Sequence, residues 1–184
     1  MSTPGTSEAV RSSATEEASP PSGDVLLHAF NALRDELVST LMYVLGNRDD
    51  ALDAAQDAFL KCWRSRGRLD GVQNVRAWIF RVALNTAKDL RRSAWHRKAM
   101  PLLGEDTMLV DRSTPAHDAL ADKEDLSRLR RAILTLREEE KEVFLLRQNG
   151  GFTYEQIAEI RHSPVGTVKT QMRAALQKLR KVLA

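Results

Sequence analysis

Apolar residues recur at intervals of three and four along most of the chain, and this period constrains the fold more than any other feature of the sequence. The stripes from Phe30 to Leu45 and from Leu120 to Leu136 are typical of amphipathic helices. Aromatic residues make up only 5% of the chain, whereas Leu, Ala, Arg and Glu are frequent, which favours helices over a sheet. The sequence therefore predicts an all-α fold.

Two segments without this period divide the chain. Residues 1–23 consist mainly of Ser, Thr, Pro, Gly, Ala and Glu, so they cannot bury enough apolar surface to offset the entropy of ordering. Residues 100–119 mix Pro, Gly, Asp, Ser and Thr without a period. We expect a disordered tail over residues 1–23, a helical domain over 24–95, a flexible linker over 96–119 and a second helical domain over 120–184.

Charge is segregated along the chain, although the net formal charge is only +3. Lys and Arg outnumber Asp and Glu by nine in residues 61–100 and by six in residues 161–184, whereas residues 24–60 carry an excess of five acids. Two basic blocks favour two phosphate-facing surfaces, and the acidic block favours a surface for another kind of partner. The competing interpretation is a solvated surface without a partner.

An amphipathic helix is expected over residues 49–64, followed by a loop over residues 65–74 that contains two glycines. The expected buried stripe of this helix is Leu52, Ala55, Phe59 and Trp63. Its other faces carry the acidic residues Asp50, Asp53 and Asp57 in the first part of the helix and basic residues at its end. The single cysteine, Cys62, lies among apolar neighbours and is expected to fill the core as a small apolar side chain.

The helix that begins near Val75 combines positive charge, amide groups and two tryptophans, a mixture that suits unstacked, single-stranded bases. Trp78 also lies on the apolar stripe, so a place in the core is the competing interpretation for it. The residues that would contact separated strands are Arg66, Arg68, Arg76, Arg81, Asn85, Lys88 and Arg92.

A helix-turn-helix motif follows near the end of the chain. Thr153 and Gln156 form a capping box that opens a short helix, a tight turn covers Arg161 and His162, and Pro164 precedes a basic helix. The second helix of such a unit enters the major groove. Thr170 and Gln171 are predicted to read bases, Lys169, Arg173, Lys178 and Arg180 to hold phosphates, and Thr167 to face outward.

Catalysis and metal binding are not expected. Asp49, Asp50 and Asp53 spell the DDxxD motif of isoprenoid synthases, but no second acidic motif follows it. The histidines are not spaced to bind a metal with Cys62, and the chain has no phosphate-binding glycine loop. No cofactor is therefore predicted. The chain also has neither a signal peptide nor an apolar run of about 20 residues, so we expect it in the cytoplasm.

Three motifs in this order, the last made of two segments, resemble the extracytoplasmic-function group of the sigma-70 family. The segment DDALDAAQDAFLKCW resembles sigma region 2.2, and VRAWIFRVALNTAKDLRR resembles regions 2.3 to 2.4. LREEEKEVFLLRQNGGFTYEQIAEI and VGTVKTQMRAALQKLRK together resemble region 4.2. The resemblance implies a promoter-specificity subunit of bacterial RNA polymerase, built of regions 2 and 4. A free-standing helix-turn-helix regulator is the alternative.

The resemblance also implies partners for each surface. Asp50, Asp53, Gln56 and Asp57 would dock on the clamp helices of the beta-prime subunit, and region 4 would dock on the beta flap. The 65–74 loop and the basic helix after it would capture the nontemplate strand of the minus-10 element. Thr167, Lys169, Thr170, Gln171 and Arg173 would read the minus-35 element as duplex, the linker would thread toward the active-site channel, and an anti-sigma factor is a common further partner.

The sequence departs from the family at the turn of the helix-turn-helix. Arg161, His162 and Ser163 stand where the family commonly has Leu-Gly-Ile. A non-glycine residue in a left-handed conformation costs roughly 1 kcal/mol, so the turn is expected to be looser or capped differently.

Overall fold

A computed structural model describes residues 21–98 and 120–183, and these residues form α-helices and one short 3₁₀-helix without any strand. The all-α prediction is confirmed. The helices are α1 (Pro21–Leu45), α2 (Arg48–Arg64), α3 (Val75–Lys98), α4 (Leu120–Leu134), α5 (Glu138–Gln148), α6 (Tyr154–Arg161) and α7 (Val165–Leu183), with the 3₁₀-helix η1 at Arg66–Gly71. The expected tail and linker lie almost wholly outside the described residues. Within the described ranges, no helix is both long enough and apolar enough to cross a membrane.

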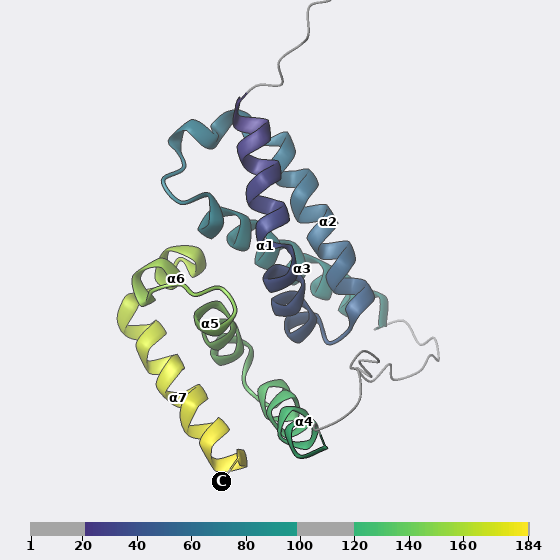
Figure 1. Ribbon diagram of the computed structural model, residues 1–184, viewed down its shortest axis with the longest axis vertical. Helices are drawn as coiled ribbons and strands as arrows, with labels where there is room; N and C mark the ends of the chain where they lie inside the picture. Colours follow the sequence, from purple (N-terminus) through teal and green to yellow (C-terminus); the bar gives the residue numbers. More distant parts are fainter. Residues whose placement is uncertain (1–20, 99–119, 184) are drawn as a thin grey trace, which may run out of the picture.

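Helices α1, α2 and α3 form one bundle, in which each helix contacts the other two (Figure 1). The buried face of α2 is made of small side chains, namely Ala51, Ala54, Ala55, Ala58 and Cys62. The expected stripe was therefore wrong in part, because Leu52, Phe59 and Trp63 are only half-buried beside this face. Since α2 packs against α1 and α3 at once, only small residues fit where the three helices meet. Burial raises the pKa of the Cys62 thiol to about 12, which suits its predicted place in the core.

Two boundaries differ from the sequence-based expectation. The expected loop over residues 65–74 contains η1, whose Leu69 is buried and attaches the segment to the bundle. Helix α3 continues to Lys98, past residue 95 at which we expected the first domain to end. Neither feature has a periodic apolar signal, because η1 is too short for one and the end of α3 is polar.

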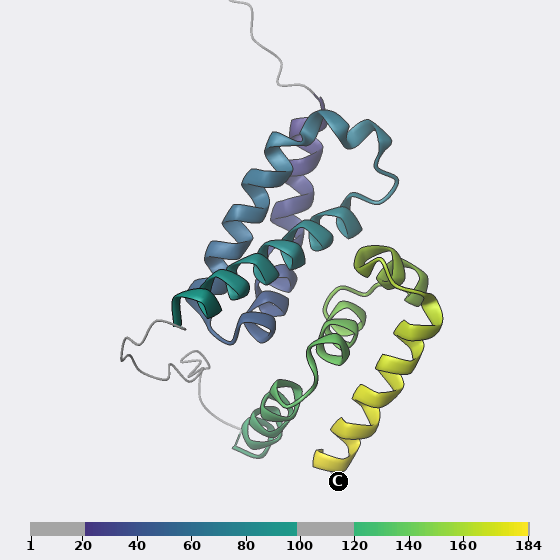
Figure 2. The same ribbon diagram turned by 180° about the vertical axis from the view of Figure 1, so that it is seen from behind.

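Helices α4 to α7 form a second group in which α7 contacts α4, α5 and α6. Its core includes Val143, Leu146, Ile157, Val168 and Ala175, all fully buried. Both views place α7 on the side of this group that faces away from α1–α3 (Figures 1 and 2). The surface of α7 is therefore open to a large partner.

The two groups also contact each other, which the sequence did not predict. Helix α1 meets α5 and helix α3 meets α6. The rings of Phe80 and Phe152 pack edge to face with centroids 5.1 Å apart. The Asn149 amide donates hydrogen bonds to the hydroxyls of Ser39 and Thr40, at 3.3 and 3.4 Å.

Candidate nucleic-acid interface

A cavity of about 290 Å³ lies where α2, α3 and the segment around η1 meet. Its lining combines cations, an amide and an aromatic ring: Lys61, Ser65, Arg68, Trp78, Val82, Asn85 and Thr86. Trp78 is half-buried, so it both packs on the core and lines this cavity. Flat apolar surface beside positive charge and an amide can accept an unstacked base.

Thr86 and Lys61 form one wall of this cavity. The buried Thr86 hydroxyl donates to the Val82 carbonyl at 2.9 Å and accepts from the Lys61 ammonium at 3.0 Å. Lys61 also lies 3.8 Å from the Asp89 carboxylate. We did not single out Lys61 or Thr86 from the sequence, because their helical positions did not reveal that both side chains reach the same cavity.

The predicted single-strand contacts do not all share this surface. Arg68 and Asn85 line the cavity. The Arg66 guanidinium lies 4.8 Å from the centroid of the Trp63 ring and donates to the Trp63 carbonyl at 2.9 Å, so it is held by its own domain. Arg81 is half-buried on α3, and Arg92 is exposed nearer its end.

Two further members of the predicted set face the second helical group. The Arg76 guanidinium lies 5.5 Å from the centroid of the Phe152 ring. The Lys88 ammonium lies 3.0 Å from a carboxylate oxygen of Glu142, whose side chain is only 1% exposed. Arg91 forms a similar ion pair with Glu138. In this arrangement, Lys88 and Arg91 are paired with carboxylates of α5.

The acidic surface of α2 is exposed. Asn47 caps the helix, because its side-chain oxygen accepts from the backbone N–H of Asp50 at 2.7 Å. Asp50, Asp53, Gln56 and Asp57 all face solvent, and Leu60 beside them is 39% exposed. No group of three or more His, Cys, Asp or Glu side chains within the described residues is arranged to hold a metal ion.

The turn of the helix-turn-helix is complete despite its lack of glycine. Thr153 and Gln156 form the predicted capping box. His162 adopts the left-handed conformation, with φ 50° and ψ 47°. The N–H of His162 donates to the Glu159 carbonyl and that of Ser163 to the Ala158 carbonyl, the pattern of a Schellman motif. Of the two expectations, a looser turn or a different cap, the looser turn is wrong, since His162 caps the helix in the conformation usually left to glycine.

Replacing His162 by glycine should raise the free energy of unfolding by about 1 kcal/mol, because glycine adopts positive φ without steric cost. Urea denaturation measures this change. His28, exposed in the interior of α1, provides the matched control, since glycine there should lower stability by roughly 0.3–0.5 kcal/mol. If His162→Gly destabilises the protein as His28→Gly does, the His162 side chain makes a contact that stabilises the fold by more than its positive φ destabilises it.

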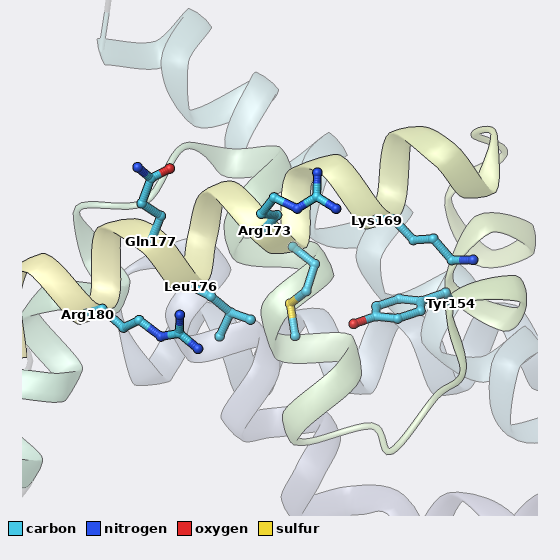
Figure 3. A pocket seen from close by; sticks show the side chains of 7 residues that line it. Tyr154, Lys169, Arg173, Leu176, Gln177 and Arg180 are labelled. Atoms are coloured by element: carbon cyan, nitrogen blue, oxygen red, sulfur yellow. The ribbon is translucent and has the colours of Figure 1, made fainter.

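A basic groove of about 650 Å³ runs along α7 beside Tyr154 of α6 (Figure 3). Lys169, Arg173 and Arg180 lie along it, and the Lys169 ammonium lies 6.0 Å from the centroid of the Tyr154 ring. Thr167 and Thr170 are exposed on the same helix. Cations along a groove with an apolar floor suit a nucleic-acid backbone.

Two of the polar residues on α7 turn toward neighbouring helices instead. Lys178, expected to hold a phosphate, lies 2.7 Å from Glu140 of α5. Burial alone would raise the pKa of the Glu140 carboxyl, but hydrogen bonds from Lys178 and the Arg137 backbone hold that pKa below its ordinary value. Gln171 accepts a hydrogen bond from Arg161, the last residue of α6.

Comparison with known proteins shows to which family this chain belongs. Residues 29–97 match the model of Sigma-70 region 2, and residues 126–179 match that of Sigma-70, region 4. The chain is 33% identical over 159 residues to the ECF RNA polymerase sigma-E factor of Haemophilus influenzae, covering 78% of this chain and 82% of that protein. This chain belongs to the extracytoplasmic-function sigma factors.

Two other proteins extend the comparison. This sigma factor is 27% identical over 156 residues to the RNA polymerase sigma-H factor of Pseudomonas aeruginosa, covering 80% of each chain. Its fold is similar to that of the sigma factor RpoE of Bartonella quintana, solved in complex with the anti-sigma factor NepR. That comparison has a TM-score of 0.65 at 22% identity and covers 87% of this chain and 94% of the other.

The family assignment places the two surfaces in different regions of this sigma factor. Region 2 contains α1 to α3 with the 290 Å³ cavity, and region 4 contains α4 to α7 with the basic groove. As a sigma factor, the protein directs RNA polymerase core to promoters in transcription initiation. This role replaces the alternative of a free-standing regulator.

Proposed function

We propose that the cavity in region 2 receives a base of the separated nontemplate strand of the minus-10 element, while α7 of region 4 reads the minus-35 element as duplex. The observation that carries this proposal is the cavity itself, which places Arg68, Trp78 and Asn85 around one space large enough for a nucleobase. Trp78 offers a stacking surface, and Asn85 offers amide donors and an acceptor to a base edge.

The acidic surface of α2 is proposed to bind the clamp helices of the beta-prime subunit. Asp50, Asp53 and Asp57 recur on one exposed face, where phosphates would be repelled and a basic protein surface attracted.

Region 4 is proposed to dock on the beta flap. Because the Bartonella quintana relative was solved with an anti-sigma factor, we propose such a regulator here as well. Because the polymerase works in the bacterial cytoplasm, we propose that this protein works there too. We also propose that it catalyses no reaction itself.

Run-off transcription with purified core polymerase of the source bacterium tests this function directly. Core enzyme plus the chain should give transcripts that core enzyme alone does not give, each starting a fixed distance downstream of a shared pair of elements. The proposal fails if no promoter of the source genome responds while the chain alone binds a palindromic operator.

Asn85→Ala should reduce transcription from duplex promoters about tenfold, because one good base-edge contact is worth about 1–3 kcal/mol. A template whose minus-10 region is already unpaired should restore most of that activity. Asn31→Ala, at an exposed position of α1, is the matched control and should leave both templates unaffected. Equal loss for Asn85→Ala on duplex and premelted templates would contradict a role in strand separation.

A further inference from the structure

Arg161 is a cation of the helix-turn-helix that does not face outward. It ends α6, and its side chain is only 9% exposed. Its guanidinium Nε donates to a carboxylate oxygen of Glu142 at 3.0 Å, and the Glu142 side chain is itself 1% exposed. A buried guanidinium paired in this way is held in one orientation and is not available to a phosphate.

The same guanidinium reaches the recognition helix. Its Nη1 donates to the side-chain oxygen Oε1 of Gln171. Because a guanidinium has donors only, the Gln171 atom that faces it must be the amide oxygen. Glu142, Arg161 and Gln171 therefore form a chain of side chains that links α5, α6 and α7 and fixes which end of the Gln171 amide points toward Arg161.

This orientation limits what Gln171 can recognise. A glutamine that reads adenine commonly uses both amide atoms, donating to N7 and accepting from N6. The oxygen has a second lone pair, but Arg161 holds the oxygen end of the amide toward α6, so the Nε2 group is the end left for DNA, and it can only donate. The acceptors that the major groove offers are N7 and O6 of guanine, N7 of adenine and O4 of thymine.

We propose that Arg161, held by Glu142, is a positioning residue that restricts Gln171 to acceptor edges, guanine above all, and prevents bidentate recognition of adenine. Guanine is favoured because it presents two adjacent acceptors. The inference rests on the proposed reading of the minus-35 element by α7. Arg161 occupies a position where the family commonly has leucine, so this restriction belongs to the present chain.

The test measures base preference rather than activity alone. Holoenzyme reconstituted from core polymerase and each variant is bound to promoters in which every base pair of the minus-35 element is varied in turn. Wild type should prefer guanine at the base pair that Gln171 contacts. Arg161→Leu should change the adenine-to-guanine ratio about tenfold toward adenine at that base pair only, whereas Arg161→Lys should keep the wild-type ratio because it retains a buried donor.

Two further variants separate positioning from folding. Arg161→Leu leaves the Glu142 charge without this partner, so Arg161→Leu combined with Glu142→Gln keeps the test valid if the single variant is unstable. Arg131→Leu removes a positive charge from an exposed site on α4 and should leave the base ratio unchanged. A structural role alone would lower affinity for all sequences equally and leave the ratio unchanged, which would overturn the inference.

A double-mutant cycle makes the outcome specific. In a Gln171→Ala background, Arg161→Leu should have no effect on the base ratio, because the group it positions is gone. If Gln171→Ala changes the preference and Arg161→Leu does not, the positioning role is wrong while the proposed function stands. If Gln171→Ala changes no preference at any minus-35 position, the proposed reading by α7 fails instead.

Discussion

Replacing Gly150 by alanine should lower the free energy of unfolding by about 3 kcal/mol, the upper end of the usual cost of overpacking a core. An added Cβ would lie 2.5 Å from two ring atoms of Phe152 and 2.6 Å from the Leu146 carbonyl oxygen. The carbonyl belongs to the backbone of α5 and cannot turn away. The Phe152 ring is 2% exposed and packs against Phe80 of the other domain, so it cannot move without opening that contact.

Urea denaturation followed by circular dichroism measures this loss. Gly166→Ala is the matched control, because that glycine lies in α7 and, apart from its chain neighbours and the local helix backbone, nothing lies within 4 Å of an added Cβ. Alanine there should raise stability by about 0.5–1 kcal/mol. If Gly150→Ala is as stable as wild type, the Phe152 ring can adopt another position and its packing against Phe80 between the domains is not tight.

Reversing two charges on the acidic surface of α2, by Asp53→Lys and Asp57→Lys together, should weaken binding to core polymerase about 100-fold. Close charge pairs across a protein interface can contribute about 1.5 kcal/mol or more each, and like charges placed opposite each other are repulsive. Both side chains are exposed, so folding should be little affected. Fluorescence anisotropy of the labelled protein titrated with core enzyme measures the affinity.

The control for this experiment changes net charge by the same amount in the same domain. Asp24 and Asp35 are exposed on α1, and replacing both by lysine should leave core binding within about threefold of wild type. If both double variants lose the same affinity for core polymerase, the effect comes from net charge, and the proposed specific role of the α2 surface is wrong.

The helices were predictable from the sequence because apolar spacing and capping residues act locally. The capping box at Thr153 and Gln156 and the start of α4 at Leu120 were placed correctly on these grounds. The buried face of α2 was not, because alanine is a weak apolar signal and only the position of α1 and α3 shows that α2 is surrounded on two sides. Spacing predicts that one face is buried, whereas the identity of that face depends on its neighbours.

The candidate site residues were also predictable only in part. Residue type and order predict Asn85, Arg68, Lys169 and Arg173 as nucleic-acid contacts, and these side chains line the region 2 cavity and the basic groove. The pairing of Lys88 with Glu142 and of Arg161 with Gln171 joins residues of different helices. Such pairs depend on tertiary packing, which a single sequence does not specify.

The ion pairs between the two domains also affect how promoter binding responds to salt. Each phosphate that a free lysine neutralises releases condensed counterions, so affinity falls steeply as salt rises. For Lys88 or Arg91 to bind a promoter phosphate, it must first leave Glu142 or Glu138, and that separation becomes easier as salt rises, because salt screens the ion pairs. The two effects oppose each other, so a plot of log affinity against log salt should be shallower than the number of phosphate contacts alone implies.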